Sequence, residues 1–221
     1  MKIAVVIPAL DEEGSVAAAV ASARAQDVEV WVVDGGSRDA TARRAEEAGA
    51  RLLEAPPGRA RQLEAGARAA GGEVVLFLHA DTRLPQGWRR AVQSACHDPG
   101  VAGGGFRLRF DGSGPALRVV EWGVRLRVAL FGLPYGDQAL FVRREVLDAA
   151  GGVPQAPIME DLDLAREMKR HGRLVRLPLA VETSGRRYQG RAFRHMLRNW
   201  AALLGWRLGL DRARLARWYA G

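Results

Sequence analysis

The stretch at residues 73–85 constrains this chain most, because a continuous apolar run there ends abruptly in a polar cluster. Residues 74–78 show no alternation of apolar and polar side chains, as expected of a strand that is covered on both faces of a parallel sheet. Ligands of such sheets gather just beyond the carboxyl ends of the strands. We therefore expect an α/β protein in which a buried strand delivers His79 and Asp81 to a ligand site.

His79 and Asp81 are residue types that can hold a divalent cation. A carboxylate two residues from an imidazole can bind the cation, and the cation can then hold a diphosphate. The alternative is that Asp81 caps a helix beginning near Pro85 while His79 packs in the core. The pair alone leaves both interpretations open.

Size and charge narrow the class of protein. The chain has 221 residues, enough for one domain with a sizeable core, and a formal net charge of +8. That charge favours an anionic partner such as a phosphorylated ligand, a nucleic acid or an acidic membrane. Cys96 is the only cysteine, which excludes an intrachain disulfide and a cysteine-based zinc site, and we expect it to be a packed thiol.

The sequence has neither a signal peptide nor a membrane-spanning segment that we can recognise. The first apolar run is cut short by Pro8, and no run approaches the roughly 18 residues that cross a bilayer. We expect a cytoplasmic protein with a surface that can touch a membrane.

The chain alternates short apolar runs with helical patterns. Strands are expected at residues 3–7, 28–33, 52–54, 74–78, 106–110, 139–142, 172–177 and 180–183. Helices are expected at residues 11–25, 39–48, 59–70, 88–97, 116–131, 159–170, 191–208 and 211–219. The three glycines at 103–105 are expected to precede the strand at 106–110.

The first strand-to-helix junction argues against an NAD-type Rossmann enzyme. Such a fold places a Gly-rich turn there, so that backbone N–H groups can approach a pyrophosphate. This chain has Asp11, Glu12 and Glu13 instead, which are expected in the first turn of the helix, where the dipole favours acids.

Other polar residues stand where expected strands end or helices begin. Asp34 can accept hydrogen bonds from a base N–H or a ribose hydroxyl, or it can simply close a turn with Gly35. Arg59 and Arg61 stand in the first turn of a helix, where cations oppose the dipole, so either phosphate contact or a solvated basic face explains them.

Two later segments are candidates of the same kind. The loop formed by Gly136, Asp137 and Gln138 precedes an apolar strand and is either an active-site loop or an ordinary turn. Glu160 and Asp161 begin a helix, which fits a helix start as well as a catalytic role.

Taken in order, these segments resemble family 2 glycosyltransferases of the GT-A fold over nearly the whole chain. Residues 7–12 resemble the family's Pro-x-x-Asn-Glu segment, with Asp11 in place of Asn. Residues 32–41 resemble the Asp-Asp-Gly-Ser-x-Asp nucleotide-recognition turn, with Gly35 replacing the second Asp. Residues 58–66 resemble the segment in which a basic residue approaches the nucleotide, and residues 79–81 occupy the place of the Asp-x-Asp motif, with His79 replacing the first acid.

The resemblance implies a mostly parallel central sheet flanked by helices, with residues 1–190 as the GT-A domain and 191–221 as a helical extension packed on it. Asp161 in the Glu160–Asp161 motif is implied as the general base, and Asp81 as the residue that holds Mg²⁺ or Mn²⁺. His195 is a second candidate ligand, although packing on its helix is the favoured role. The implied donor-binding residues are Pro8, Ala9, Asp11, Glu12, Asp34, Gly35, Arg61, His79, Ala80, Asp81, Arg186 and Arg187. The acceptor-side candidates are Gly136, Asp137 and Gln138.

Four segments resemble one bacterial subgroup more narrowly, the radical-SAM/selenodomain-associated transferases linked to arsenosugar biosynthesis. They are residues 58–62, 77–82, 136–138 and 184–187. The expected reaction is inverting transfer from a UDP- or GDP-sugar to a hydroxyl acceptor, a small molecule, with no nucleic-acid partner.

Two other functions remain as alternatives. One is a nucleotidyltransferase, although such enzymes usually carry a Gly-rich basic loop where this chain has the acids at 11–13. The other is a non-catalytic basic module that binds a membrane or nucleic acid through the C-terminal Arg and Trp residues.

Overall fold

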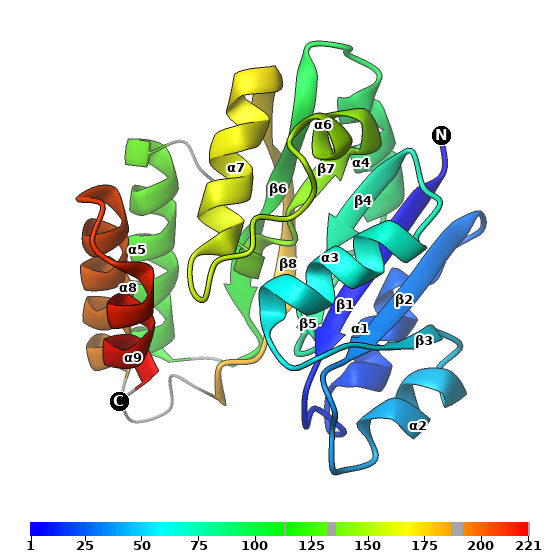
Figure 1. Cartoon of the computed structure of the whole chain (residues 1–221), viewed down its shortest axis with the longest axis horizontal. Coiled ribbons are helices and arrows are strands. Elements are labelled where there is room, and N and C mark those ends of the chain that lie inside the picture. The colour runs from blue at the N-terminus through cyan, green and yellow to red at the C-terminus, as the bar shows by residue number, and fades with distance from the viewer. Residues whose placement is uncertain (113, 132–135, 187–191, 221) are drawn as a thin grey trace.

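The computed structural model describes residues 1–112, 114–131, 136–186 and 192–220, and Arg187 lies outside these ranges. In this part of the chain an eight-stranded sheet runs in the order β3-β2-β1-β4-β7-β6-β8-β5 (Figure 1). The strands are β1 (Ile3–Ala9), β2 (Val28–Asp34), β3 (Arg51–Glu54), β4 (Val74–Phe77), β5 (Thr82–Arg83), β6 (Val101–Phe110), β7 (Phe141–Arg143) and β8 (Arg173–Thr183).

The sheet is mixed, with a parallel half and a half that contains antiparallel pairs. β3, β2, β1 and β4 are parallel neighbours, whereas β7 runs antiparallel to both β4 and β6. β6 pairs in parallel with β8, and β5 closes the edge antiparallel to β8. Since β4, β6 and β8 point the same way, their carboxyl ends meet at one edge of the sheet.

Helices cover both faces of this sheet. They are α1 (Val16–Ala23), α2 (Thr41–Glu47), α3 (Arg59–Ala69), α4 (Trp88–Cys96), α5 (Pro115–Phe131), α6 (Arg144–Ala149), α7 (Glu160–His171), α8 (Ala192–Arg207) and α9 (Arg212–Ala220), with a short 3₁₀ helix η1 (Gly136–Gln138). Val5 belongs to an apolar cluster that includes residues of α1 and α4, while its neighbour Val6 belongs to a second cluster that includes residues of α3, α6 and α7. The uninterrupted apolar runs of the strands are therefore explained by burial on both sides.

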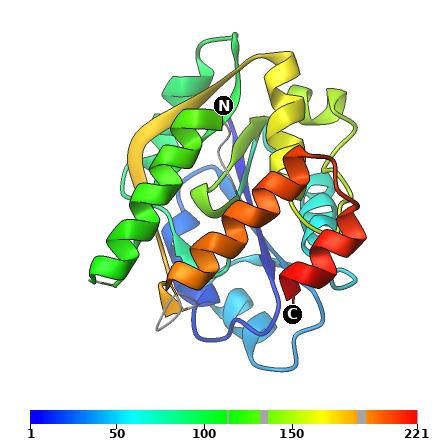
Figure 2. The same ribbon diagram turned by 90° about the vertical axis from the view of Figure 1, so that its left-hand side faces the viewer.

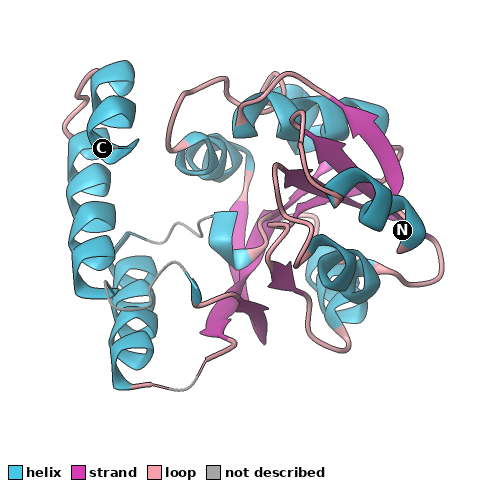
Figure 3. Ribbon diagram, turned by 90° about the horizontal axis from the view of Figure 1, so that it is seen from below, coloured by secondary structure: helices cyan, strands magenta, loops and turns pink. Residues whose placement is uncertain are grey.

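α5, α8 and α9 form a separate layer at one end of the sheet, as seen from below in Figure 3. Leu203 of α8 packs on Leu162 and Ala165 of α7, which attaches this layer to the rest of the protein. In the part of the chain that the structure describes, no helix is both long and apolar enough to cross a membrane.

The expected helix start at residue 11 is wrong. α1 begins at Val16, and no acidic residue lies in its first turn. Asp11 has a φ of 52°, in the left-handed region, which a right-handed helix cannot contain. Its N–H instead donates to Ser37 Oγ at 3.0 Å, so the loop after β1 is joined to the loop after β2.

Two expectations about strands are also wrong, and β5 and α6 were not anticipated because both are too short to show a period. The glycines at 103–105 lie inside β6, where a Cβ on Gly104 would stand 2.0 Å from the Val175 carbonyl oxygen of β8. Residues 172–177 and 180–183 belong to the single strand β8, which stays paired with β6 across a register shift.

Candidate active site

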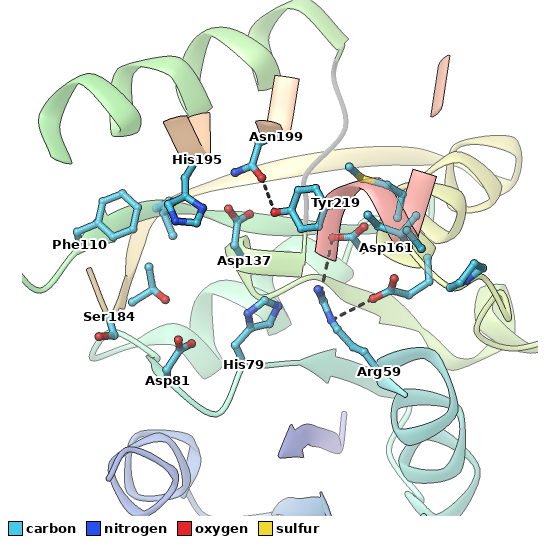
Figure 4. Close-up of a pocket in the computed structure, with 17 residues that line it drawn as sticks. Arg59, His79, Asp81, Phe110, Asp137, Asp161, Ser184, His195, Asn199 and Tyr219 are labelled. Carbon is cyan, nitrogen blue, oxygen red and sulfur yellow. Dashed lines mark hydrogen bonds and ion pairs between the residues drawn. The ribbon is translucent and has the colours of Figure 1, made fainter. Parts of the chain in front are cut away.

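A cavity of about 540 Å³ opens at the sheet edge where β4, β6 and β8 end. Its ionisable lining residues are Arg59, His79, Asp81, Asp137, Glu160, Asp161 and His195 (Figure 4). Leu108 and Phe110 of β6 contribute apolar surface, and His195, Asn199 and Tyr219 from α8 and α9 form one wall. The sequence-predicted pair His79 and Asp81 therefore does lie in a cavity at strand carboxyl ends.

Arg59, the first residue of α3, occupies the centre of the carboxylate cluster. Its Nε lies 3.0 Å from Glu160 Oε1, and its Nη2 lies 3.6 Å from Asp161 Oδ2 (Figure 4). Burial alone would lower the pKa of Arg59, but the charges of Glu160, Asp161, Asp137 and Asp81 outweigh it and raise that pKa. This guanidinium therefore stays charged and holds the start of α7 against the start of α3.

Asp161 is held in place by backbone donors. The N–H of Gly136 donates to Asp161 Oδ2 at 2.7 Å, and the N–H of Leu162 donates to Oδ1 at 2.9 Å. The Asp161 side chain is only 12% exposed. Its carboxylate is thus oriented by two N–H groups and one guanidinium before any ligand is bound.

Glu160 lies deeper than Asp161. Burial raises the pKa of Glu160, the charge of Arg59 opposes that rise, and the neighbouring Asp161 adds to it, with the net result above the ordinary value. Glu160 is therefore the buried partner of Arg59, and Asp161 is the more exposed one.

The three acceptor-side candidates, which form η1, have different environments. Asp137 lines the cavity. A Cβ on Gly136 would lie 1.8 Å from Arg59 Nη2 and 3.0 Å from Asp161 Oδ2, so a larger residue here would force the guanidinium to move. Gln138 is 2% exposed and donates to the Phe106 carbonyl at 2.9 Å, so it braces η1 on β6 and does not line the cavity.

Asp81 is linked to the loop after β1 through Arg186. Arg186 Nη2 is hydrogen-bonded to Glu12 Oε2 and lies 4.0 Å from Asp81 Oδ2. Glu12 is further held by Ser15, whose hydroxyl donates to the same Oε2 at 2.8 Å. Arg186 thus carries a positive charge between two candidate donor-site carboxylates.

The fit to a divalent cation depends on Asp81. Among the described residues, no three His, Cys, Asp or Glu side chains are grouped so that they could hold a metal ion by themselves. His195 lines the same cavity as Asp81 without completing such a group. Mg²⁺ is commonly bound by one or two carboxylates together with substrate phosphates. The residues therefore fit a cation that shares its ligands with a bound diphosphate, and they do not form a preassembled cage.

Asp34 closes the turn after β2. It accepts hydrogen bonds from the N–H groups of Gly36 at 3.1 Å and Ser37 at 2.9 Å, and from the Ser37 hydroxyl. Gly35 donates its N–H to the Ala9 carbonyl at 2.9 Å. This turn lies at the ends of β1 and β2, outside the lining of the main cavity, as do Pro8, Asp11 and Ala80.

The sequence interpretation named Arg59 and Arg61 together as possible phosphate contacts, but only Arg61 entered the expected donor-binding set. Arg61 is exposed, and its Nη1 is 3.4 Å from the Pro57 carbonyl. Gln62, three residues after Arg59, is buried and donates to the carbonyls of Ala9 and Val33. Arg59, Arg61 and Gln62 therefore have different roles because their side chains leave α3 in different directions. The two adjacent acids Glu160 and Asp161 were the feature of the sequence that predicts a nearby cation.

Comparisons with known proteins agree with this geometry. The model of the family described as "Glycosyl transferase family 2" matches residues 4–148. No curated protein matches the chain. Among solved structures, a mycobacterial protein known from its crystal structure is 26% identical with a TM-score of 0.66, covering 96% of this chain and 76% of that one.

Glucosyl-3-phosphoglycerate synthase from Mycobacterium tuberculosis has a similar structure. Its complex with Mn²⁺, UDP-glucose and phosphoglyceric acid is 23% identical with a TM-score of 0.66, covering 95% of this chain and 80% of that one. Its complex with Mg²⁺ and UDP is 21% identical with a TM-score of 0.65 and the same coverage. These similarities confirm the expected GT-A type of α/β fold.

Proposed function

Since this chain belongs to glycosyl transferase family 2, we propose that it is an inverting enzyme that moves a sugar from a nucleotide-diphosphate donor to a hydroxyl acceptor. The observation that carries the proposal is the cavity in which Asp81, Asp161 and Arg59 meet at the carboxyl edge of the sheet. In this cavity Asp81 could bind a divalent cation, Asp161 could accept a proton, and Arg59 supplies a positive charge.

The donor would lie across the ends of β1, β2 and β4. Asp34 and Gly35, with Pro8, Ala9 and Asp11, are the proposed nucleotide contacts, since they surround one turn. The proposed diphosphate contacts are Glu12, Arg61, His79, Ala80, Asp81, Arg186 and Arg187. When bound at Asp81, Mg²⁺ or Mn²⁺ would stabilise negative charge on the leaving diphosphate.

Asp161 is the proposed general base. It would accept the proton of the acceptor hydroxyl while that oxygen bonds to the anomeric carbon, and the bond to the diphosphate oxygen would break on the opposite face. The N–H of Gly136 and the guanidinium of Arg59 hold this carboxylate in its position in the cavity. Glu160 is proposed to hold Arg59 in position.

The charge of the cavity favours a small neutral acceptor. Among the described residues that line the cavity, Asp81, Asp137, Glu160 and Asp161 outnumber one arginine, Arg59, so an acceptor phosphate or carboxylate would be repelled. Crystal structures of the mycobacterial synthase contain phosphoglyceric acid or glycerol 3-phosphate. We propose that this chain differs from that neighbour and takes an uncharged polyol or sugar.

The narrower subgroup and the division of the chain also remain proposals. The resemblance to the radical-SAM/selenodomain-associated transferases is supported by the fact that each of its four segments supplies at least one lining residue: Arg59, His79 with Asp81, Asp137 and Ser184. Residues 1–190 would form the transfer domain, and residues 191–221 an extension that contributes His195 to the cavity wall.

Calorimetric titration tests the donor site. The protein is titrated with UDP and with GDP, each with and without Mn²⁺, and the titrations are repeated on Asp81→Ala. We expect Mn²⁺ to strengthen the binding of one diphosphate at least tenfold, and the gain to vanish in Asp81→Ala. Asp148→Ala, which removes an exposed carboxylate of α6, is the matched control and should keep it. Equal binding with and without Mn²⁺ in the wild type would contradict the proposal.

The acceptor class is tested with a matched pair of compounds. Glycerol should compete for the acceptor site better than glycerol 3-phosphate in a transfer assay, and Asp137→Asn should narrow the difference by removing one negative charge. A preference for the phosphate in the wild type would contradict the neutral-acceptor assignment without affecting the donor result.

A further inference from the structure

The three helices α5, α8 and α9 form one outer face of the protein. Figure 2 shows them side by side, with nothing in front of them. Most of the large apolar side chains that are exposed in the described residues belong to these helices or to the turn between α8 and α9; Met1 and Leu10 are the exceptions. A soluble protein rarely exposes so many large apolar side chains together unless the surface has a partner.

α8 carries a continuous apolar stripe on its exposed side. Phe193, Leu197 and Leu204 of α8, followed by Leu208 directly after its last residue, are spaced by four, seven and four residues, which returns each to the same side of an α-helix. Phe193 is 67% exposed and Leu208 is 68% exposed. The stripe therefore faces solvent along the length of the helix, whereas the apolar side of a surface helix usually faces the core.

α5 has a matching stripe. Val119, Trp122 and Leu126 share one side of the helix, and Trp122 is 63% exposed. The two helices touch at Gly123, where a Cβ would lie 3.3 Å from Met196 Sδ of α8. Trp122 and Leu197 are the neighbours in sequence of these contacting residues, so the two stripes border the same contact.

Arginines surround the apolar stripes. Arg118 and Arg125 on α5, Arg194 and Arg207 on α8, and Arg217 on α9 are all exposed. α8 and α9 contain no acidic residue. The one acid of α5, Glu121, is 4% exposed; it accepts a hydrogen bond from the Phe110 N–H at 3.0 Å, and its Oε2 lies 3.6 Å from Arg118 Nη1.

We propose that this face, formed by α5, α8 and α9, docks on a membrane surface that contains anionic lipids. Apolar side chains rimmed by arginines are suited to the interface, where the former enter the acyl region and the latter pair with headgroups. A second copy of the chain fits less well, because a two-fold contact would place arginines against arginines. The inner side of the same layer carries His195, Asn199 and Tyr219, so docking would hold the cavity beside the bilayer.

Vesicle sedimentation of the full chain tests the proposal. The wild type should bind vesicles of phosphatidylcholine with phosphatidylglycerol, bind pure phosphatidylcholine at least tenfold more weakly, and lose affinity as salt is raised. Light scattering of the free protein at the same concentration should report a monomer. No binding to the anionic vesicles, or a dimer that excludes them, would overturn the proposal.

Two double variants separate the apolar and the basic contributions. Phe193→Ser with Leu197→Ser should weaken vesicle binding at least tenfold, and Arg194→Gln with Arg207→Gln should weaken it about 25-fold, at about fivefold for each arginine. Arg43→Gln with Arg90→Gln, exposed arginines of α2 and α4, is the matched control and should change binding less than twofold. If the control variant lost as much vesicle affinity as the α8 variant, the protein would bind vesicles through its net charge alone. That result would overturn the assignment of the docking surface to α5, α8 and α9.

A site-specific label reports the contact even if a double variant folds poorly. Because Cys96 is 5% exposed and burial raises its thiol pKa, a dye should react selectively with a newly introduced cysteine. A polarity-sensitive dye on Leu204→Cys should shift to shorter emission wavelengths with anionic vesicles, whereas the same dye on Arg43→Cys should not. An unshifted label at position 204 on bound protein would contradict docking through this face.

Discussion

The loops after β1 and β2 differ from the cavity at the ends of β4, β6 and β8 in how their carboxylates are satisfied. Asp34 accepts a hydrogen bond at 2.9 Å from the Ser37 N–H of its own turn, and Asp11 accepts one at 2.8 Å from the Arg38 N–H of the neighbouring loop. In the cavity, Asp161 also accepts from two backbone N–H groups, but it and Glu160 in addition share the guanidinium of Arg59.

The two groups of carboxylates therefore have different roles, one structural and the other in the proposed reaction. Carboxylates that hold backbone N–H groups fix a rigid turn, suited to recognising a nucleotide. Glu160 and Asp161, gathered around Arg59, line the cavity in which a substrate would bind. Substitutions in the cavity should therefore alter turnover and pH dependence, and substitutions among structural carboxylates should mainly alter stability.

The largest effect is expected along α7. Asp161→Asn should lower kcat by about 10²–10⁴-fold while changing the affinity for the donor diphosphate little, because the lost group acts on a proton. Steady-state kinetics with calorimetry of the diphosphate checks this split.

Asp163→Asn is the matched change two residues further on. Asp163 accepts from Trp206 Nε1 at 2.8 Å and from Arg212 Nη2 at 2.7 Å, so it joins α7 to α8 and α9. Its substitution should lower the free energy of unfolding by about 1–2 kcal/mol and affect turnover far less. If Asp161→Asn and Asp163→Asn lowered kcat by comparable factors, the assignment of a catalytic role to Asp161 and a structural role to Asp163 would be contradicted.

The next effect concerns the two arginines of α3. Arg59→Gln should lower the free energy of unfolding by about 1–3 kcal/mol, since it leaves Glu160 and Asp161 without their shared cation. The estimate is below that for a fully buried pair because the Arg59 side chain is 38% exposed. Arg61→Gln should stay within about 0.5 kcal/mol. Urea unfolding of both variants measures the difference. Equal free energies of unfolding would contradict the claim that Arg59 stabilises the carboxylate cluster.

An effect of about the same size is expected at Gly136. Gly136→Ala should displace Arg59 or Asp161 and lower the free energy of unfolding by about 1–3 kcal/mol, because the new methyl group would occupy the position of the guanidinium. Gly14→Ala, where no atom lies within 4 Å of the added Cβ, is the control and should be close to neutral. Thermal unfolding compares the two, and an equally stable Gly136→Ala protein would show that the cluster tolerates looser packing.

The smallest effect is a pH dependence at Glu160. Because its pKa in the folded protein lies above the ordinary value of 4.5, the unfolded state releases its proton first as the pH rises. The free energy of unfolding of the wild type, minus that of Glu160→Gln, should fall as the pH rises above 4.5 and level off above the raised pKa. Urea unfolding at several pH values checks the sign, and a difference that grows with pH would contradict it.

Much of the fold followed from the sequence, since long apolar runs such as residues 3–7 and 74–78 can only be strands buried on both faces. The helix start near Asp11 was misplaced because its carboxylate bonds to a loop 27 residues away, at Arg38. Local patterns contain no information about such a contact. The glycines of β6 were misread for a similar reason, since their role is set by β7 and β8 across the sheet.

The candidate site was predicted in part. His79, Asp81, Asp137, Glu160 and Asp161 were named from the sequence, and the structure brings them into one cavity. Arg59 was passed over in favour of Arg61, because only the direction of each side chain from α3 distinguishes them. The wall from Asn199 and Tyr219 depends on how α8 and α9 pack, which no motif encodes.

The anomeric configuration of the product tests the central claim most directly. A panel of UDP- and GDP-sugars is supplied with Mn²⁺ and a neutral polyol, and the first sugar product is followed by proton NMR. We expect release of the nucleoside diphosphate and a product whose configuration is inverted relative to the donor, with both signals lost in Asp161→Asn. A product that retains the donor configuration, or one formed equally well by Asp161→Asn, would contradict the account.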